Sequence, residues 1–390
     1  MRIALVHDYI KEYGGAERVL EVLHEVFPDA PIFTTVYLPE FLGPHQERFE
    51  KWKIKTSFLQ GLPLKAKLIS PFRILAPFVF KTFDFSQYDL IITSATGAYN
   101  PNVLNKKSAK LICYCHTPPR YLYGFATARE WKNNLFLRVF GELANHFLRL
   151  VDFRSSQNVD YFIANSENVA GRIKKFYRKD STVIYPPVDT ASSGLGYSVE
   201  LKEKKLNAVK LNAKRYYLAG GRLARPKHID LIVETFSKLN MPLKVFGRGF
   251  AGYELEIKSK VKSQKSKVEF LGEVTDEEKL ELMKNAKAFV FASEDEDFGI
   301  TPVEAMGVGT PVIAYRSGGV LETVVDPSAG SGQAATGLFF DRLSIESLSS
   351  AIRKFEKSKF DSNELIKHAQ KFSKDRFKRE IREFVESKLK

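Results

Sequence analysis

The sequence predicts an α/β protein built from two doubly wound domains, each on a parallel sheet. Short apolar runs alternate with helical patterns along all 390 residues, as in strand–helix–strand units. The runs are almost continuously Val, Ile, Leu and Phe, as expected for parallel strands covered by helices on both faces. They fall into two series of about six strands, which favours two domains.

The first series of strands occupies the N-terminal half and opens on Ile-Ala-Leu-Val directly after the second residue. Each later run is bounded by turn residues or by a helical pattern. The predicted strands of this half are Ile3–His7, Ile32–Val36, Leu90–Ser94, Lys110–Cys115, Tyr161–Asn165 and Ser181–Tyr185. Those of the second half are Tyr216–Ala219, Leu243–Phe246, Val268–Leu271, Ala288–Phe291, Pro311–Ala314 and Gly337–Phe340.

The domain boundary is predicted where turn residues and lysines accumulate, after Pro186-Pro187. We therefore expect an N-terminal domain over 1–190, a linker over 191–213 and a C-terminal domain over 214–370. Residues 363–390 have the periodicity of an amphipathic helix. We expect the part over 371–390 to pack back on the N-terminal domain. The apolar positions of the whole pattern over 363–390 are Ile366, Phe372, Phe377, Ile381 and Phe384.

Composition excludes disordered and fibrous proteins, since 44% of the residues are hydrophobic and 27% are charged. The formal net charge is +14, and residues 51–150 alone contribute +11. A basic surface of this kind attracts phosphate groups, whether of a nucleotide, an anionic lipid or a nucleic acid.

The two cysteines, Cys113 and Cys115, are too few for a disulfide framework or a four-thiolate zinc site, so we expect free buried thiols. The N-terminus lacks the apolar core and cleavage site of a signal peptide. No apolar run approaches the ~18 residues of a membrane span. We expect a cytoplasmic protein, peripheral at the inner face of the plasma membrane.

The first motif with chemical meaning contains Glu296 and Glu304, eight residues apart across a predicted strand-to-helix turn. Such a turn presents the backbone N–H groups of Phe298, Gly299 and Ile300, which suit a phosphate or a sugar hydroxyl. Glu304 lies far enough into the helix to accept hydrogen bonds from a vicinal diol such as a ribose. A capped helix with a solvated acidic loop is the alternative, because Glu296 belongs to a run of four acidic residues.

The second motif places Arg222 and Lys227 just beyond a Gly-Gly turn that follows a predicted strand. Two cations at the start of a helix form a clamp for a diphosphate, although two exposed basic residues in a loop are also common. The third motif is Gly14-Gly15 after the first strand, where backbone can approach a phosphate closely.

The segment between Gly247 and Gly252 matches the dinucleotide fingerprint G-x-G-x-x-G. It lies on a later unit than the first βα turn, and no acidic residue closes a following strand at the required offset. We therefore interpret Gly247 and Gly249 as a loop that approaches a nucleotide, and we do not expect an NAD site.

His116 follows a predicted strand and precedes a Thr-Pro-Pro turn. Open α/β sheets bind ligands at the carboxyl ends of their strands, so this position favours function. A structural histidine is an equally good interpretation of the residue by itself.

Together these segments resemble glycosyltransferase family 4, whose members are retaining enzymes with the GT-B fold, two Rossmann-like domains facing across a cleft. Within the family the chain resembles the bacterial mannosyltransferases that build O-antigen and other surface polysaccharides. The segments are Gly-Gly-Ala-Glu-Arg at 14–18, His-Thr-Pro at 116–118, Ile-Ala-Asn-Ser at 163–166, Tyr-Pro-Pro-Val-Asp at 185–189, Gly-Arg-Leu at 221–223 with Lys227, and the glutamates 296 and 304.

The resemblance implies a role for each matched residue. Glu296 would hold hydroxyls of the donor sugar, and His116 would contact that sugar and help to stabilise charge at the reaction centre. Glu304 would bind the nucleotide ribose. The donor phosphates would be bound by Arg222, Lys227, Gly14 and Gly15, with the backbone of Phe298, Gly299 and Ile300. The subgroup motif has Met and a Trp-Asp pair where this chain has Pro119 and Tyr123-Gly124, so a carboxylate is absent there.

The chemistry follows from the charges that develop when a sugar–phosphate bond breaks. Fixed cations and N–H dipoles stabilise the leaving diphosphate more in the transition state than in the ground state. We therefore expect no metal and no cofactor, with a nucleotide sugar such as GDP-mannose as substrate. Retention in glycosidases usually needs a carboxylate nucleophile, and the sequence has no clear candidate. The resemblance therefore implies the family's front-face route, in which departure and attack occur on the same face of the sugar.

The stretch 51–83 holds seven basic residues and no acid, with six aromatic side chains interleaved. This composition is typical of a surface that enters an anionic membrane interface, where a lipid-linked or glycan acceptor would be met. The alternative is a segment packed on its sheet with lysines that reach solvent. The residues we expect to serve the acceptor or membrane are Lys65, Lys67, Arg73 and Arg120.

Three other functions share some of these features. A GT-B nucleotide-sugar epimerase would act on the donor without an acceptor. A metal-dependent transferase could use Asp295 and Asp297 as a D-x-D site. A polyanion or nucleic-acid binder could use the basic region, but it has no use for the glutamate and Arg/Lys pairs, so we expect no nucleic-acid partner. The oligomeric state stays open.

Overall fold

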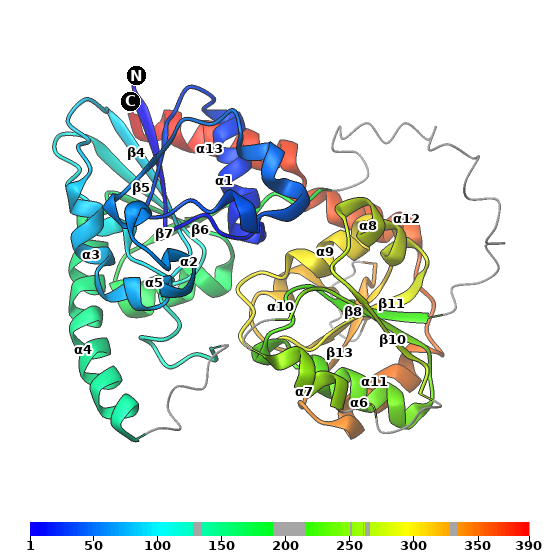
Figure 1. Cartoon of the computed structure of the whole chain (residues 1–390). Helices are drawn as coiled ribbons and strands as arrows, with labels where there is room; N and C mark the ends of the chain where they lie inside the picture. The colour runs from blue at the N-terminus through cyan, green and yellow to red at the C-terminus, as the bar shows by residue number, and fades with distance from the viewer. Residues whose placement is uncertain are drawn as a thin grey trace. The chain divides into compact units, whose positions relative to one another are not determined.

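The computed structural model describes residues 1–127, 135–189, 216–249, 252–259, 261, 266–327 and 334–389 (Figure 1). It divides into two compact units, Met1–Pro187 with Arg376–Lys390, and Val188–Asp375. The predicted linker over 191–213 lies outside the described residues. Each unit contains one parallel sheet, so the prediction of two doubly wound α/β domains is confirmed.

The first unit has a seven-stranded parallel sheet in the order β3-β2-β1-β4-β5-β6-β7. Six of its strands were predicted, and the missing one, β3, lies inside the basic stretch. Its three residues include Lys55, whose ammonium group lies over the Phe33 ring at 5.1 Å, so no apolar run marked it. The strands are β1 (Ile3–His7), β2 (Ile32–Thr34), β3 (Ile54–Thr56), β4 (Leu90–Ala95), β5 (Lys110–Cys115), β6 (Tyr161–Ala164) and β7 (Ser181–Val183).

Alternate side chains of this sheet feed two cores, as the pleat requires. Leu5 belongs to a core completed by α1 and α13, whereas Ala4 and Val6 belong to a core on the opposite face. Neither Cys113 nor Cys115 is in a disulfide, and both are buried in that opposite core. The helices of the unit are α1 (Gly15–Val26), α2 (Lys65–Leu68), α3 (Ala76–Val79), α4 (Leu135–Asn158), α5 (Glu167–Tyr177) and α13 (Lys374–Leu389).

The second unit has a six-stranded parallel sheet in the order β10-β9-β8-β11-β12-β13. Helices α6, α7 and α11 cover one face, and α8, α9 and α12 the other (Figure 1). Its strands are β8 (Tyr216–Gly220), β9 (Leu243–Phe246), β10 (Val268–Gly272), β11 (Ala286–Phe291), β12 (Val312–Tyr315) and β13 (Gly337–Phe340). Its helices are α6 (Ile229–Leu239), α7 (Tyr253–Ser259), α8 (Asp276–Lys284), α9 (Ile300–Gly307), α10 (Val320–Thr323), α11 (Ile345–Phe355) and α12 (Ser362–Ala369).

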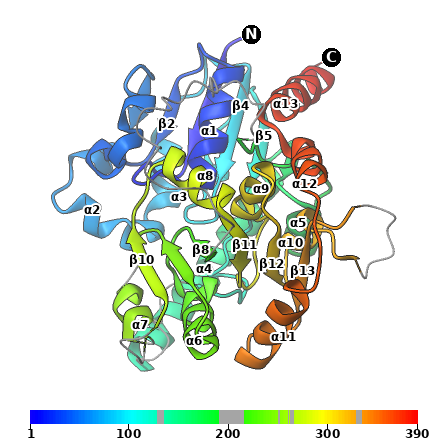
Figure 2. The same ribbon diagram turned by 90° about the vertical axis from the view of Figure 1, so that its right-hand side faces the viewer.

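The C-terminal segment is two helices where the sequence predicted one. A short 3₁₀ turn over Gln370–Phe372 separates α12 from α13, and the Phe372 carbonyl accepts a hydrogen bond from Val188 N–H at 2.9 Å. Beyond this turn α13 lies against the first sheet beside β5 (Figure 2), where the Phe377 ring is 5.7 Å from that of Tyr114. The periodicity continues through the break because both helices bury one apolar face.

Candidate active site

The predicted residues of the C-terminal half gather where the strand order of the second sheet reverses. Chain order runs outward from β8 through β9 to β10, and then from β11 through β12 to β13 on the other side. The loops after β8 and β11 therefore flank the switch point, which is where open α/β sheets bind ligands. Lys227 belongs to the loop after β8 and Glu296 to the loop after β11.

Lys227 and Glu296 are in direct contact, which the sequence did not predict. The Lys227 ammonium group donates a hydrogen bond to Glu296 Oε2, and the Ser293 hydroxyl donates to the same oxygen at 2.5 Å. Lys227 Nζ also lies 5.2 Å from the centre of the Phe291 ring. The pair thus joins a cation suited to phosphate and a carboxylate suited to sugar hydroxyls at one point.

Backbone contacts with two neighbouring loops fix the acidic loop that carries Glu296. The Glu294 N–H donates to Pro226 O at 2.8 Å, and the Gly319 N–H donates to Glu296 O at 2.7 Å. A Cβ atom on Gly318 would lie 2.3 Å from the same carbonyl oxygen, so this approach requires glycine. Sequence reasoning missed Gly318 and Gly319, although a glycine pair soon after a predicted strand was a usable signal.

Helix α9 begins just after this loop, with Gly299 as its N-cap at a φ of +94°. No side chain caps the helix, and the binding of an anion by its first N–H groups, at Ile300 and beyond, stays a prediction. For Phe298 the predicted role concerns only the backbone N–H group, and it stays a prediction. Its side chain is buried, and the ring lies 5.4 Å from that of Phe372, so it belongs to the core of the unit.

Glu304 lies on the second turn of α9, as predicted, and it is almost completely buried. Its Oε1 atom accepts a hydrogen bond from Lys279 Nζ at 2.9 Å, and the same ammonium group reaches Asp276 at 3.0 Å. The sequence did not single out Lys279, which comes from α8. The ion pair compensates the burial of the Glu304 carboxylate.

Replacing Lys279 with methionine should destabilise the second unit by about 3 kcal/mol, because Glu304 would stay buried without its cation. The change is measured by urea unfolding followed through the hydrogen exchange of α9 amides. Lys279→Met combined with Glu304→Gln should recover much of the loss, since the buried charge is then gone. Equal stability of the single variant and the wild type would contradict this account of the pair.

The glycine loops after β8 and β9 support each other. A Cβ atom on Gly247 would lie 1.8 Å from Gly221 O, and Leu223 N–H donates to Arg248 O at 3.0 Å. The Glu254 carboxylate accepts hydrogen bonds from the Lys258 side chain and from Gly249 N–H. Both bonds lower the pKa of Glu254, and the Lys258 bond has the larger effect. Gly247 and Gly249 thus position the loop after β8, which carries the exposed Arg222.

In the first unit, the predicted phosphate loop begins α1. Gly14 N–H donates to Glu17 Oε2 at 3.0 Å, so this N–H group is bonded within the chain, and the role of Gly14 and Gly15 at the donor phosphates stays a prediction. Gly15 is the first residue of the helix. The other oxygen, Glu17 Oε1, lies 3.5 Å from Nε2 of the buried His7. This pairing of Glu17 with His7 was not predicted from the sequence.

His116 lies one residue beyond β5, at the end of the strand as predicted. It is buried, and its Nε2 atom is 2.9 Å from the Ser94 hydroxyl oxygen. Burial, with a smaller contribution from His7, lowers the pKa of His116 to about 3. The imidazole is therefore neutral near pH 7, so any charge stabilisation by His116 must come from its dipole.

The first unit should lose stability as the pH falls below 6.5. In the unfolded protein His116 then binds a proton, whereas in the folded protein its lowered pKa keeps it neutral. The slope attributable to this residue is about 1.4 kcal/mol per pH unit between 6.5 and about 3. Hydrogen exchange of β5 amides at pH 7.5 and 5.0 measures it, with His116→Gln as the comparison. An identical pH dependence in both proteins would refute the attribution to His116.

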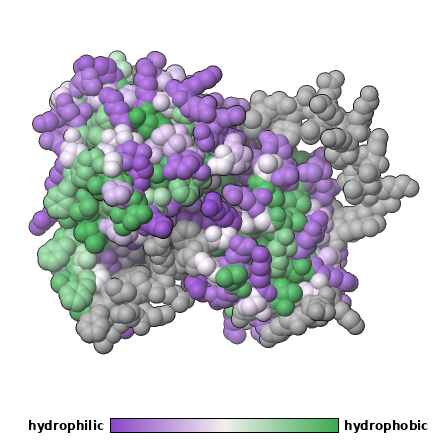
Figure 3. Space-filling model, in the orientation of Figure 1, coloured by the Kyte–Doolittle hydropathy of each residue, from purple (hydrophilic) through white to green (hydrophobic). Residues whose placement is uncertain are grey.

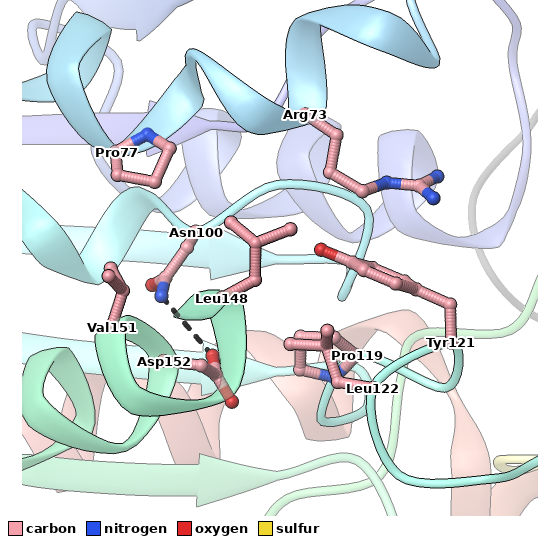
Figure 4. A pocket seen from close by; sticks show the side chains of 9 residues that line it. All are labelled: Arg73, Pro77, Asn100, Pro119, Tyr121, Leu122, Leu148, Val151 and Asp152. Atoms are coloured by element: carbon pink, nitrogen blue, oxygen red, sulfur yellow. Dashed lines mark hydrogen bonds between the residues drawn. The ribbon is translucent and has the colours of Figure 1, made fainter. Parts of the chain in front are cut away.

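A small pocket in the first unit involves Arg73, one of the predicted acceptor residues (Figure 4). The Arg73 guanidinium lies 4.0 Å from the centre of the Tyr121 ring, and its Nε donates to Ala98 O at 3.1 Å. Asp152, from α4, lines the same pocket and accepts a hydrogen bond from Asn100 at 3.2 Å. Burial raises the pKa of Asp152 to about 7. Arg120 does not line this pocket and is partly exposed.

Tyr123, at the position where the resembled subgroup has Trp, also reaches this carboxylate. Its hydroxyl donates to Asp152 Oδ2 at 2.7 Å, and that of Tyr177 donates to Oδ1 at 3.2 Å. Gly124 follows Tyr123 with a φ of +80°. A carboxylate from α4 therefore lies beside Tyr123, and the sequence pattern gave no indication of it because α4 lies further along the chain.

The basic aromatic stretch 51–83 agrees in part with each of its two interpretations, a membrane-binding surface and a segment packed on its sheet. Phe58 and Phe78 are exposed, whereas Trp52, Phe72, Phe80 and Phe83 pack against the sheet or its core. Hydrophobic surface extends over α3 and α4 (Figure 3), and α4 was not predicted. Exposed apolar side chains on α4 include Val139, Phe140, Leu143, Phe147, Leu150 and Phe153. No helix among the described residues is both long enough and apolar enough to span a membrane.

Two family models match the chain. The Glycosyltransferase Family 4 model covers residues 13–192, and the Glycosyl transferases group 1 model covers residues 202–372. Together they span most of the sequence, and each corresponds to one of the two units.

Similar curated proteins are alpha-1,3/1,6-mannosyltransferases ALG2. The one from Dictyostelium discoideum is 28% identical over 288 residues, which cover 66% of each chain. The one from Kluyveromyces lactis is 24% identical, with 83% of this chain and 71% of that protein covered. The Saccharomyces cerevisiae protein is 25% identical, with 64% of this chain and 55% of that protein covered, so the match spans little more than half of that relative.

Solved structures share the fold. The sucrose-phosphate synthase from Thermosynechococcus elongatus superimposes with a TM-score of 0.73 at 18% identity, over 100% of this chain and 99% of that one. HepE from Anabaena in complex with UDP gives a TM-score of 0.66 at 18% identity, over 99% and 100%.

Proposed function

The chain belongs to glycosyltransferase family 4 and has the GT-B fold, and from this premise we propose that it is a retaining mannosyltransferase using a nucleotide sugar. The acceptor we propose is a lipid-linked saccharide or a growing polysaccharide, as in O-antigen synthesis. The Lys227–Glu296 contact carries the proposal, because it combines a phosphate-binding cation with a sugar-binding carboxylate at the switch point. The ALG2 mannosyltransferase relatives support the choice of mannose.

In the proposed reaction, Lys227, Arg222 and the first N–H groups of α9 bind the donor diphosphate. Their charges and dipoles are fixed before the bond breaks, so they stabilise the leaving group without reorganisation. Glu296 accepts hydrogen bonds from hydroxyls of the sugar, and Glu304 accepts them from the ribose. Lys227 then shares its protons between Glu296 and the diphosphate, which keeps the carboxylate oriented toward the sugar.

We also propose that no metal takes part and that the acceptor attacks the face from which the diphosphate leaves. The support is that Lys227 and Arg222 can supply the charge that a metal would otherwise supply. Activity that disappears in excess chelator and returns with Mg²⁺ or Mn²⁺ would instead favour the D-x-D alternative at Asp295 and Asp297.

The first experiment is a thermal-shift panel of GDP-mannose, UDP-glucose, UDP-galactose and UDP-N-acetylglucosamine. A ligand that binds the folded protein raises its melting temperature by mass action. We expect one base to be preferred and its shift to be lost in Lys227→Ala. Radiolabelled sugar should then appear on a lipid-linked acceptor. Conversion of the donor to an isomeric nucleotide sugar without an acceptor would establish the epimerase alternative.

We further propose that the first unit binds an anionic membrane through a docking surface formed by Lys65, Lys67, Phe58 and Phe78. The two phenylalanines are exposed, and the stretch 51–83 carries no acidic residue to repel the lipid headgroups. Lys65→Glu/Lys67→Glu should weaken sedimentation with anionic vesicles at least tenfold. Lys357→Glu/Lys359→Glu, an equal charge change in the second unit, should not. Equal binding of neutral and anionic vesicles would argue against this surface.

A further inference from the structure

Helix α4 is amphipathic in the reverse sense of a helix in the core of a water-soluble domain. Among its residues whose burial is described, every buried one is polar, namely Asn145, Asp152, Ser155 and Ser156. Most of its exposed residues are apolar, namely Val139, Phe140, Leu143, Phe147, Leu150 and Phe153. At about 100° per residue these six positions fall within an arc of about 140°, so they form one stripe along about 21 Å of the helix. His146 is the polar residue inside this arc, and Arg154 ends it.

Hydrogen bonds fix the buried polar side of α4. Asn100 donates to the Asp152 carboxylate at 3.2 Å, and the Ser155 hydroxyl donates to Asn100 Oδ1 at 2.9 Å. Tyr123 and Tyr177 donate to the same carboxylate. Rotation of α4 about its axis would leave a buried carboxylate without these donors, which is costly. The apolar stripe is therefore held on the outside of the first unit by the bonds on the opposite side of the helix.

The stripe continues onto exposed apolar residues of the basic stretch 51–83. Pro77 of α3 and Leu148 and Val151 of α4 line one pocket, so the two elements are neighbours (Figure 4). Exposed residues on and before α3 are Ile74, Leu75 and Phe78. We call these three residues and the six of the stripe the apolar face. Soluble proteins commonly expose single apolar side chains, whereas a contiguous group of this kind marks an interaction surface.

The charges around the apolar face are mainly positive. The arginines on or beside α4 are Arg138, Arg149, Arg154 and Arg178. The guanidinium of Arg178 lies 6.0 Å from the centre of the Phe153 ring. The acidic residues of α4 are Glu142 and Asp152, of which Asp152 is buried, and the stretch 51–83 contains none. An apolar face with a cationic rim complements an anionic bilayer, because aromatic side chains enter the headgroup region while arginines extend to the phosphates.

A second copy of this chain is the other occupant that an apolar face suggests. In a two-fold dimer the same surface meets itself, so the basic rim of one copy would face the basic rim of the other. Like charges brought together at an interface disfavour association. A bilayer of anionic lipids carries no such penalty, and it fits the charge of +11 over residues 51–150.

We propose that α4 is an in-plane membrane helix, whose apolar face enters the interface of an anionic bilayer while its polar side stays bonded to the first unit. The inference rests on the proposed membrane docking of the first unit and adds a hydrophobic anchor to it. Lys65 and Lys67 attract the lipid surface from a distance, and the apolar face supplies insertion once contact is made.

Sedimentation of the full chain with vesicles of phosphatidylethanolamine and phosphatidylglycerol tests the anchor. Phe140→Ser/Phe147→Ser should lower the partition coefficient about tenfold or more, because two exposed rings lose their transfer into lipid. The loss should persist in about 0.5 M NaCl, where the attraction between charges is screened. Without lipid the variant should melt at the wild-type temperature, since both side chains are exposed.

Leu255→Ser is the matched control. It removes an apolar side chain that is 77% exposed on α7 of the second unit, and we expect wild-type binding to the vesicles. Wild-type binding by Phe140→Ser/Phe147→Ser, with binding lost in Lys65→Glu/Lys67→Glu, would overturn the role of α4 and leave the docking surface proposed above in place.

A polarity-sensitive fluorophore attached to Phe147→Cys measures whether the stripe enters the lipid. Cys113 and Cys115 are buried, so the label should attach to the new thiol alone. Vesicles should shift its emission to shorter wavelength, and lipids brominated along their acyl chains should quench it. The same label on Leu255→Cys should show neither effect. An unshifted label at position 147 in protein that sediments with the vesicles overturns the insertion.

Analytical ultracentrifugation without lipid tests the second copy as occupant. A dimer that Phe140→Ser/Phe147→Ser dissociates, in a protein that binds no vesicles, would overturn the membrane assignment in favour of a protein interface. The outcome is separate from that of the proposed reaction, because sedimentation and the label need neither donor nor acceptor. A protein that inserts α4 but transfers no sugar would refute the proposed transfer and confirm the anchor.

Discussion

Glu296→Ala should lower the rate of sugar transfer by about 100- to 1,000-fold while the protein stays folded and still binds the nucleotide. The magnitude is that of losing one preorganised polar group at a reaction centre. In the structure, Glu296 accepts hydrogen bonds from Lys227 and Ser293, so its removal also frees the cation that it holds. The rate is measured as sugar incorporated at saturating donor and acceptor, and binding is measured by thermal shift with the nucleotide diphosphate.

Glu294→Gln serves as the control for the acidic loop. Glu294 is two residues away and more exposed, and its Oε2 atom lies 3.2 Å from His228 Nε2. Because its carboxylate is bonded to His228 and, among the described residues, neither to Lys227 nor to the Ser293 hydroxyl, we expect transfer within about threefold of wild type. Wild-type turnover by Glu296→Ala, or an equal loss in both variants, would remove Glu296 from the proposed site.

Gly247→Ala should destabilise the second unit by about 3 kcal/mol or more. The residue has a φ of +121°, and its Cβ would lie 1.8 Å from the carbonyl oxygen of Gly221. Neither backbone can retreat cheaply, since Gly247 N–H is bonded to Gly272 O and Gly221 N–H to Phe246 O. Backbone strain and overcrowding each cost about 1–3 kcal/mol. Urea unfolding of the second unit measures the loss, and donor binding should weaken with it because Arg222 follows Gly221.

Gly252→Ala is the matched comparison. Gly252 also has a positive φ, +79°, but a Cβ there would meet no atom of the described residues within 4 Å. We expect only the cost of the left-handed conformation, about 1 kcal/mol. If the two substitutions destabilise equally, the contact between the loops after β8 and β9 is not what requires glycine at 247.

Much of the fold could be predicted because its signals are local. A buried parallel strand is a continuous apolar run, and all twelve such runs are strands of the two sheets. The strand β3 escaped because Lys55 interrupts it and its three residues leave no pattern. The break between α12 and α13 escaped because apolar periodicity does not report where one helix stops and another starts.

The candidate site was predicted as a set of residues and not as a set of contacts. Glu296, Glu304, Arg222 and Lys227 carry recognisable residue types at recognisable spacings, which is local information. The partners of Glu304 and of His116 come from other elements, and their residue types are ordinary, so no spacing pointed to Lys279 or Ser94.

The sequence by itself thus determined two parallel α/β domains, the strand ends that carry the chemistry, and the family resemblance that assigned roles to them. Only the tertiary structure decided that Lys227 contacts Glu296, that Lys279 neutralises Glu304, and that Ser94 lies beside His116. The physical reason is that strand order and sheet register, which are set by burial over the whole domain, bring these side chains together. These paired residues are distant in sequence, whereas a single sequence shows only local information, namely residue types and their spacings.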